Sequence, residues 1–281
     1  MLARRAAAGL GSLTEGVVGS GRVGAATHRS DLRFAILTVA ALFAAHAIAF
    51  FLHEYSHAVM AWLLGFKADP LALSYGHLNL SNFLLQQGID ENVRWKAIFD
   101  GGHGDAAAAI ALAGVGIGNG VLYVVLTLIL KRHMSRMRPA AVLFLFWLAL
   151  MASGNLWSYA PVRTITTHGD MALAAHGLGI SPWTLFPFVV LPSVWAAWDF
   201  FSRLVPLVLG RVCGSDVLHR VFVTVIACFV FFGFYGGCPA VGGNYGNISA
   251  VFSIASLFVL FAVITMIMLL PIRAGRPIAT A

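Results

Sequence analysis

Long apolar runs recur six times along the chain and are separated by shorter polar segments. A helix needs about 20 apolar residues to cross a hydrocarbon core roughly 30 Å thick. Six runs meet this length, at residues 34–66, 106–130, 140–158, 185–209, 219–236 and 249–270. The first run exceeds what a perpendicular crossing requires, so we expect that helix to tilt or to extend beyond the bilayer.

Two segments between these runs differ from ordinary short loops. Residues 71–81 alternate apolar residues with small or polar ones, which is the pattern of a short β-hairpin. Residues 159–184 are half apolar, and irregular backbone at membrane depth is tolerated only where protein or a water-filled cavity covers it. The pattern therefore predicts an all-α polytopic membrane protein of about six transmembrane helices, with a small membrane-associated β-hairpin after the first.

Composition supports a membrane protein and argues against nucleic-acid binding. Only 10% of the residues are charged and 59% are hydrophobic, whereas a soluble domain has about 25% charged residues. The net charge of +7 would indicate a nucleic-acid partner if the basic residues clustered on a soluble module. They lie instead at the ends of apolar runs, so we expect a lipid bilayer around the protein and no nucleic acid.

The distribution of basic residues predicts the orientation. Fourteen of the 18 Lys and Arg residues lie in segments that share one side if both termini are cytoplasmic, against Lys67, Arg94, Lys96 and Arg163 on the other. Lys and Arg concentrate in cytoplasmic segments, so both termini are expected in the cytoplasm. Arg163 is expected to extend toward the outer headgroups. The expected location is a bacterial inner membrane, with an organelle membrane as the alternative.

Three regions follow from this pattern. Residues 1–33 contain five Arg and many Gly, Ala and Ser, and predict a disordered basic cytoplasmic tail. Residues 34–209 form the transmembrane core, which contains the first four helices. Residues 210–281 supply two additional transmembrane helices and a short C-terminal tail.

The motif His-Glu-x-x-His occurs within the first apolar run, at residues 53–57. On a helix this spacing places His53 and His57 one turn apart on the same face. Both can therefore bind one Zn²⁺, while Glu54 can act on the metal-bound water. Ionisable residues at membrane depth are costly and usually functional. No Lys or Arg lies nearby in the sequence to pair with these three, so a divalent metal is the expected common partner.

A catalytic zinc has three protein ligands and one open position, so a third ligand must come from elsewhere. The candidates are His46, His77, His103, His168, Asp170 and His176. At 1.5 Å per residue, His53 lies about 30 Å along a helix that starts near residue 34, in the outer half of the bilayer. The third helix runs toward the same side and brings Asp170 there, which favours Asp170.

These features together resemble the site-2-protease family of intramembrane zinc metalloproteases. The motif at 53–57 lies in the first core helix, and residues 113–119 resemble the family's small-residue stretch ending in Asn. Asn155, a later Pro and then Asp170 beside Gly resemble its motif for the third ligand. The similarity covers residues 34 to about 200, and the PDZ-like domain of some relatives has no counterpart.

The match is incomplete around the third ligand. The family places Asp before Gly with the Asn closer upstream, whereas here Gly169 precedes Asp170 and Asn155 lies fifteen positions away. His168 and His176 therefore remain alternatives. Asn119 and Asn155 are expected either to orient substrate and stabilise an oxyanion or to hydrogen-bond between helices. The glycines at 114, 116, 118 and 120 are expected to permit close helix packing.

The resemblance implies a zinc metalloendopeptidase that hydrolyses a peptide bond in or near a transmembrane segment of a membrane-protein substrate. Zn²⁺ on His53, His57 and Asp170 would polarise the scissile carbonyl and lower the pKa of its water. Glu54 would accept the water proton and pass it to the leaving amine. The alternatives are a zinc hydrolase acting on a lipid or small amphiphile and a non-catalytic metal-binding scaffold. The sequence does not determine the oligomeric state.

Overall fold

The computed structural model describes residues 3–237 and 245–269, and it describes their side chains except those of residues 3–29 and 268. Two compact units, residues 1–40 and 41–281, divide the chain. The predicted C-terminal tail lies outside the described residues.

The described part is helical, as predicted, and six of its helical segments are long and apolar enough to span a membrane. These segments are Ser30–Leu63, Gly104–Arg136, Pro139–Val162, Pro182–Val212, Val217–Tyr235 and Asn247–Ile267. Each overlaps one of the six predicted runs. The pattern of apolar residues therefore predicted all six spans, and most of the predicted ends lie within a few residues of the observed ends.

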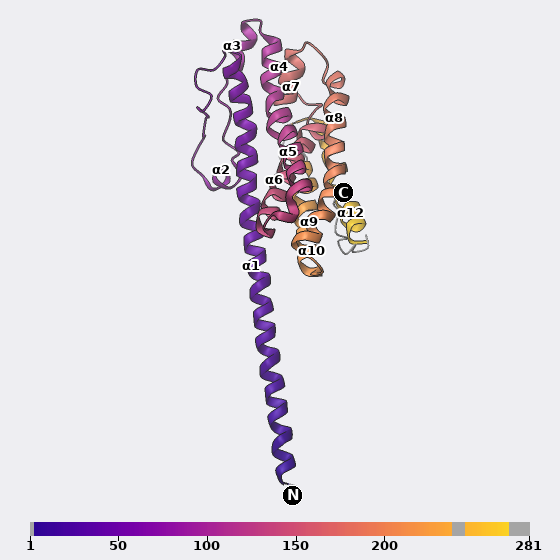
Figure 1. The fold of residues 1–281 in the computed structure, drawn as a ribbon. Helices are drawn as coiled ribbons and strands as arrows, with labels where there is room; N and C mark the ends of the chain where they lie inside the picture. Colours follow the sequence, from indigo (N-terminus) through magenta and orange to yellow (C-terminus); the bar gives the residue numbers. More distant parts are fainter. Residues whose placement is uncertain (1–2, 238–244, 270–281) are drawn as a thin grey trace. The chain divides into compact units, whose positions relative to one another are not determined.

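Figure 1 shows the order of the α-helices along the chain. Several of the spans also contain short π-helical or 3-10 segments. The α-helices are α1 (Ala3–Leu63), α2 (Leu80–Leu85), α3 (Trp95–Asp100), α4 (Gly104–Ala113), α5 (Leu122–His133), α6 (Pro139–Trp157), α7 (Asp170–Gly177), α8 (Pro182–Asp199), α9 (Val205–Val212), α10 (Val217–Cys228) and α12 (Asn247–Leu269). The π-helices are η1 (Gly114–Val121), η3 (Ser158–Val162), η4 (Phe200–Leu204) and η5 (Phe229–Tyr235), and η2 (Met134–Arg136) is a 3-10 turn.

Helix α1 begins at Ala3, so residues 3–33 are helical rather than the disordered tail that the sequence predicted. Ala, Leu and Arg are strong helix formers, and no proline occurs before Pro70. The apolar span that follows also supplies a formed helix from which the upstream residues can continue, which removes the cost of nucleation.

The hairpin predicted within residues 71–81 is wrong. Ser74 forms a single antiparallel bridge with Asp90, outside that range, and no strand forms within 71–81. The Asn79 side chain accepts a hydrogen bond of 2.7 Å from the Asn82 backbone amide and starts α2 at Leu80. A side-chain cap of this kind stabilises a helix start, so it ends the extended segment that the alternation suggested.

Helix α6 lies at the centre of the 41–281 unit. It packs against α5, α8, α9, η1 and η5, and Phe146 and Trp147 on it are fully buried. Phe146 stacks on Phe200 with 5.2 Å between ring centroids. Side chains on the outer helices are exposed and apolar, such as Phe258 at 72%, as expected of a surface that faces lipid.

A polar cluster also joins the second and fourth spans. The buried Asp199 carboxylate accepts hydrogen bonds from Lys131 Nζ at 2.8 Å and from the Tyr123 hydroxyl at 3.0 Å. Ionisable groups inside membranes normally pair in this way, and the sequence pattern did not indicate these partners.

Candidate metal centre

Helix α1 brings His53 and His57 together, because residues four apart lie on the same face of a helix. Both imidazoles are buried, and their Nε2 atoms are 3.1 Å apart. This is the arrangement that the sequence motif predicted for the two nitrogen ligands.

Asp170 is the first residue of α7 and points its carboxylate at the two histidines. Its Oδ2 atom is 3.2 Å from His53 Nε2 and 3.4 Å from His57 Nε2. Helix α7 packs along α4 (Figure 1). A side chain on Gly104 would overlap the backbone of Gly177, so the two glycines permit the close contact that positions Asp170.

The other candidate third ligands point elsewhere. His168 is exposed and stacks on the Tyr245 ring at 4.4 Å between centroids, while His176 packs on Phe99 at 4.7 Å. His103 lies against Phe66. The structure therefore places Asp170, and neither His168 nor His176, beside the pair at 53 and 57.

Hydrogen bonds to the outer ring nitrogens hold both imidazoles. His57 Nδ1 donates to the Ile110 carbonyl at 2.7 Å, which leaves its Nε2 facing Asp170. His53 Nδ1 lies 2.8 Å from the Asn119 side-chain amide, which in turn lies 3.3 Å from the side-chain amide of Asn155. Contacts of this kind orient the ring of a ligating histidine. Asn119 is fully buried behind His53, a position suited to orienting the imidazole.

Two of the four glycines in η1 explain how closely α1 packs against η1. A Cβ atom on Gly114 would overlap His57 Nε2 and lie 2.7 Å from His53 Cε1, and one on Gly118 would lie 2.7 Å from His53 Cα. Gly116 would meet nothing within 4 Å, and Gly120 only a carbonyl at 3.6 Å. The packing role predicted for the glycine stretch therefore applies to Gly114 and Gly118.

The candidate ligands are of types that could hold a metal ion. His Nε2, His Nε2 and a carboxylate oxygen lie within 4.8 Å of one another, and zinc binds nitrogen and oxygen donors of these types. Among the described residues, Asp170 Oδ2 is buried without a hydrogen bond of ordinary geometry. Lone-pair atoms that converge in this way require positive charge between them, either protons on the imidazoles or a metal cation.

The electrostatics at Asp170 agree with that requirement. Burial by itself raises the pKa of this carboxyl, but the adjacent His57 and His53 outweigh burial and hold the pKa below its usual value. Asp170 is therefore ionised at neutral pH and presents a full negative charge to the histidines.

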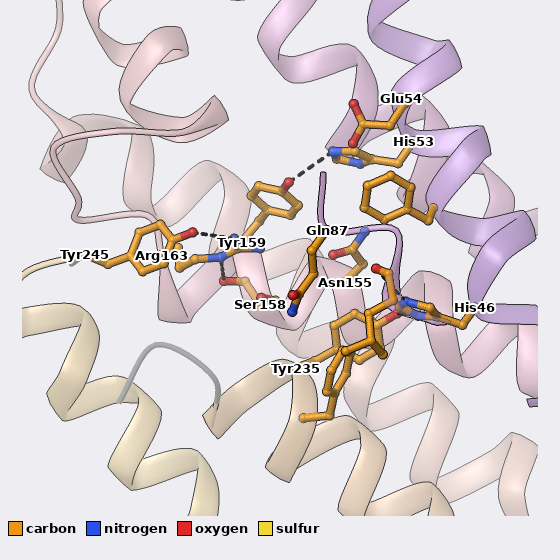
Figure 2. A pocket seen from close by; sticks show the side chains of 13 residues that line it. His46, His53, Glu54, Gln87, Asn155, Ser158, Tyr159, Arg163, Tyr235 and Tyr245 are labelled. Atoms are coloured by element: carbon orange, nitrogen blue, oxygen red, sulfur yellow. Dashed lines mark hydrogen bonds between the residues drawn. The ribbon is translucent and has the colours of Figure 1, made fainter. Parts of the chain in front are cut away.

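A cavity of about 180 Å³ opens beside this group and is lined by Glu54, His53, Asn155, Tyr159, Arg163 and His46 among others (Figure 2). Glu54 is itself buried, at 7% exposure. His46 lies across the cavity, with Nδ1 3.3 Å from the Tyr235 hydroxyl and Nε2 3.4 Å from the Leu85 carbonyl. A carboxylate, a candidate metal-binding imidazole and an amide therefore face one cavity.

Sequence reasoning did not predict the roles of Tyr159 and Arg163 in this cavity. The Tyr159 hydroxyl lies 3.1 Å from His53 Nε2, and its ring stacks on the imidazole. Arg163 was expected at the outer headgroups, but it is half-buried with its guanidinium 4.3 Å from the centre of the Tyr159 ring. Tyr159 lies one helical turn after Asn155 on the same face, and this spacing is the one signal in the sequence that could have indicated it.

No protein-family model matches the chain, and the comparisons with curated proteins and with solved structures also gave no match. The function must therefore be argued from the site.

Proposed function

We propose that this protein is an intramembrane zinc metalloendopeptidase that hydrolyses a peptide bond in or near a transmembrane segment of another membrane protein. The observation that carries the proposal is the convergence of His53 Nε2, His57 Nε2 and Asp170 Oδ2 within 3.1–3.4 Å of one another. A Glu follows the first of these histidines in the order that zinc peptidases use, and the group belongs to a chain with six apolar spans.

In this proposal His53, His57 and Asp170 hold the metal. When bound, Zn²⁺ supplies a Lewis acid that polarises a carbonyl and lowers the pKa of a water molecule. Asn119 and the Ile110 carbonyl keep the two imidazoles in place through their Nδ1 atoms. Preorganised ligands of this kind avoid the cost of rearrangement during the reaction.

Glu54 is the proposed general base and acid. It accepts the proton of the attacking water and delivers it to the leaving amine. Its burial in the cavity wall, next to His53, supports this assignment. Asn155 also lines the cavity and is proposed to donate a hydrogen bond to the substrate carbonyl.

The proposed substrate is a transmembrane helix, whose carbonyls are hidden in its own hydrogen bonds and become accessible only after local unwinding. The proposed setting is a bacterial inner membrane with both termini in the cytoplasm, supported by the distribution of Lys and Arg.

The test measures zinc content and peptide cleavage for the purified full-length protein, Glu54→Gln and Asp170→Ala. The substrates are synthetic single-span peptides with a fluorophore and a quencher on opposite sides of the span. Glu54→Gln should keep zinc and lose cleavage by at least about 100-fold, as expected when a general base is removed. Asp170→Ala should lose zinc and activity together.

The outcomes separate the proposal from its rivals. Full cleavage by Glu54→Gln would show that the peptidase mechanism is wrong, and zinc retention by Asp170→Ala would show that the third ligand is misassigned. A lipid hydrolase would release a lipid product and leave the peptides intact. A scaffold would bind membrane partners equally well with Gln at position 54.

A further inference from the structure

Arg163 places a positive charge in the wall of the cavity that contains Glu54 and His53 (Figure 2). The residue follows η3 directly and turns inward, with the Tyr159 ring 4.3 Å and the Tyr245 ring 5.3 Å from its Cζ atom. The two rings hold the guanidinium by cation–π contacts. Its position is therefore determined by packing, which is unusual for an arginine at the end of a span.

Most of the hydrogen-bonding capacity of this guanidinium is not used by the described residues. Nε donates to the Ser158 carbonyl at 3.2 Å, and one terminal nitrogen donates to the Tyr245 hydroxyl at 3.3 Å. A guanidinium has five N–H donors in a planar fork. Among the side chains that the structure describes, in residues 30–237 and 245–269 without 268, no carboxylate lies within ion-pair distance of it.

The walls around this cation are aromatic. Tyr159, Tyr245, Phe50, Phe234 and Tyr235 line the same cavity of about 180 Å³. This volume and lining suit an apolar or aromatic side chain. The planar fork of an arginine binds a carboxylate through two parallel hydrogen bonds.

We propose that Arg163 forms a substrate carboxylate subsite beside the candidate metal centre. The proposal rests on the proposed peptidase function and deepens it by defining the substrate as a peptide with a carboxylate close to the scissile bond. An aromatic or aliphatic group next to that carboxylate occupies the tyrosine- and phenylalanine-lined part of the cavity.

The spacing fits a single peptide chain. The Tyr159 phenol contacts both groups: its ring centre is 4.3 Å from Arg163 Cζ, and its hydroxyl is 3.1 Å from His53 Nε2. An extended chain covers about 3.3–3.6 Å per residue. One or two residues therefore connect a carboxylate at Arg163 to a carbonyl at the histidines.

Two parts of a peptide can supply the carboxylate. One is the α-carboxylate of a free C-terminus, in which case the enzyme removes a terminal residue or a short terminal fragment. The other is the side chain of Asp or Glu within the chain. Both use the same contact with Arg163, so the experiment must separate them.

The primary test is a binding measurement that requires no hydrolysis. Titration calorimetry measures the affinity of the full-length protein in detergent for 3-phenylpropionate and for 3-phenylpropionamide. Wild type, Arg163→Gln and Arg163→Lys are each measured before and after treatment with a chelator. Neither probe contains a peptide bond between two residues, so neither is a peptidase substrate. The carboxylate should bind wild type about 10- to 100-fold more tightly than the amide, as expected for charge-assisted hydrogen bonds.

Arg163→Gln should abolish this preference and leave the affinity for the amide unchanged, which also shows that the cavity has kept its shape. Arg163→Lys should retain part of the preference, because it keeps the charge without the planar fork. Equal affinity of wild type for the two probes, including no binding of either, would overturn the subsite. An equal loss of affinity for both probes in Arg163→Gln would assign Arg163 a structural role and would also overturn the subsite.

A second arm identifies the source of the carboxylate. The quenched peptides are compared as free acids and C-terminal amides, and with Glu or Gln near the scissile bond. Slower cleavage of the amides assigns the subsite to a free C-terminus, and slower cleavage of the Gln peptides assigns it to a side chain. If wild type shows no carboxylate preference while its cleavage still depends on Glu54, the subsite alone is rejected, whereas Glu54-independent cleavage would reject the peptidase.

Discussion

Replacing Gly114 by Ala tests whether close helix contact builds the proposed zinc site. The added Cβ would overlap His57 Nε2 and lie 2.7 Å from His53 Cε1. Carbon contacts are comfortable only at about 3.5–4.0 Å, so α1 and η1 would have to separate by about 1 Å. Metal–ligand distances tolerate only about 0.2 Å of error. The substitution should therefore weaken zinc binding as well as destabilise the fold.

The expected magnitudes follow from these distances. Overpacking of a tight contact costs about 1–3 kcal/mol of folding free energy, and displaced ligands should weaken zinc binding by at least about 10-fold. Thermal unfolding in detergent and competition with a chelator of known zinc affinity measure the two effects.

Gly116→Ala is the matched control, since its Cβ would meet nothing within 4 Å in the same π-helix. It should leave zinc affinity unchanged and slightly raise stability, because Ala is favoured over Gly in a helix by up to about 1 kcal/mol. Equal zinc affinities for the two variants would refute the reasoning. Destabilisation of Gly114→Ala with unchanged zinc affinity would confine the role of Gly114 to packing.

Substitutions at three further contacts test them individually. Asn119→Ala removes the partner of His53 Nδ1 and should weaken zinc binding by about 10- to 100-fold; chelator competition that finds no change would remove Asn119 from the site. Tyr159→Phe removes the hydroxyl beside His53 and should reduce kcat with zinc content unchanged if that hydroxyl contacts the reacting carbonyl, whereas a change in KM alone would contradict this role. Asp199→Ala leaves Lys131 without its carboxylate and should cost about 1–3 kcal/mol of stability. The control, Arg203→Gln, removes a largely exposed partner of the same carboxylate and should cost under about 1 kcal/mol. Equal thermal unfolding midpoints for the two variants would contradict a buried ion pair.

The helices and the first two candidate ligands were predictable because both are local properties of the chain. A run of about 20 apolar residues has few alternatives to a spanning helix in a bilayer, and all six runs overlap observed spans. The i, i+4 spacing of His53 and His57 determines that they share a face of any helix. Neither result depends on how the helices pack.

Contacts between distant segments could not be obtained in this way. The choice of Asp170 over His168 depends on where α7 begins and on the close packing of α7 against α4. The roles of Gly114 and Gly118, but not Gly116, depend on which face of η1 meets α1. The hairpin predicted from the alternation in residues 71–81 does not form. The side chain of Asn79 caps a helix there instead, and this local contact outweighed a weak strand pattern.

The inward position of Arg163 is the clearest case. From the sequence, an arginine at the end of a span is expected to reach toward the headgroups. Here the rings of Tyr159 and Tyr245 meet around its guanidinium, and Tyr245 lies far along the chain. The sequence by itself determined the membrane helices and a pair of histidines on one of them. The tertiary structure determined which carboxylate joins that pair and which cation faces the same cavity, because both depend on which helix faces meet.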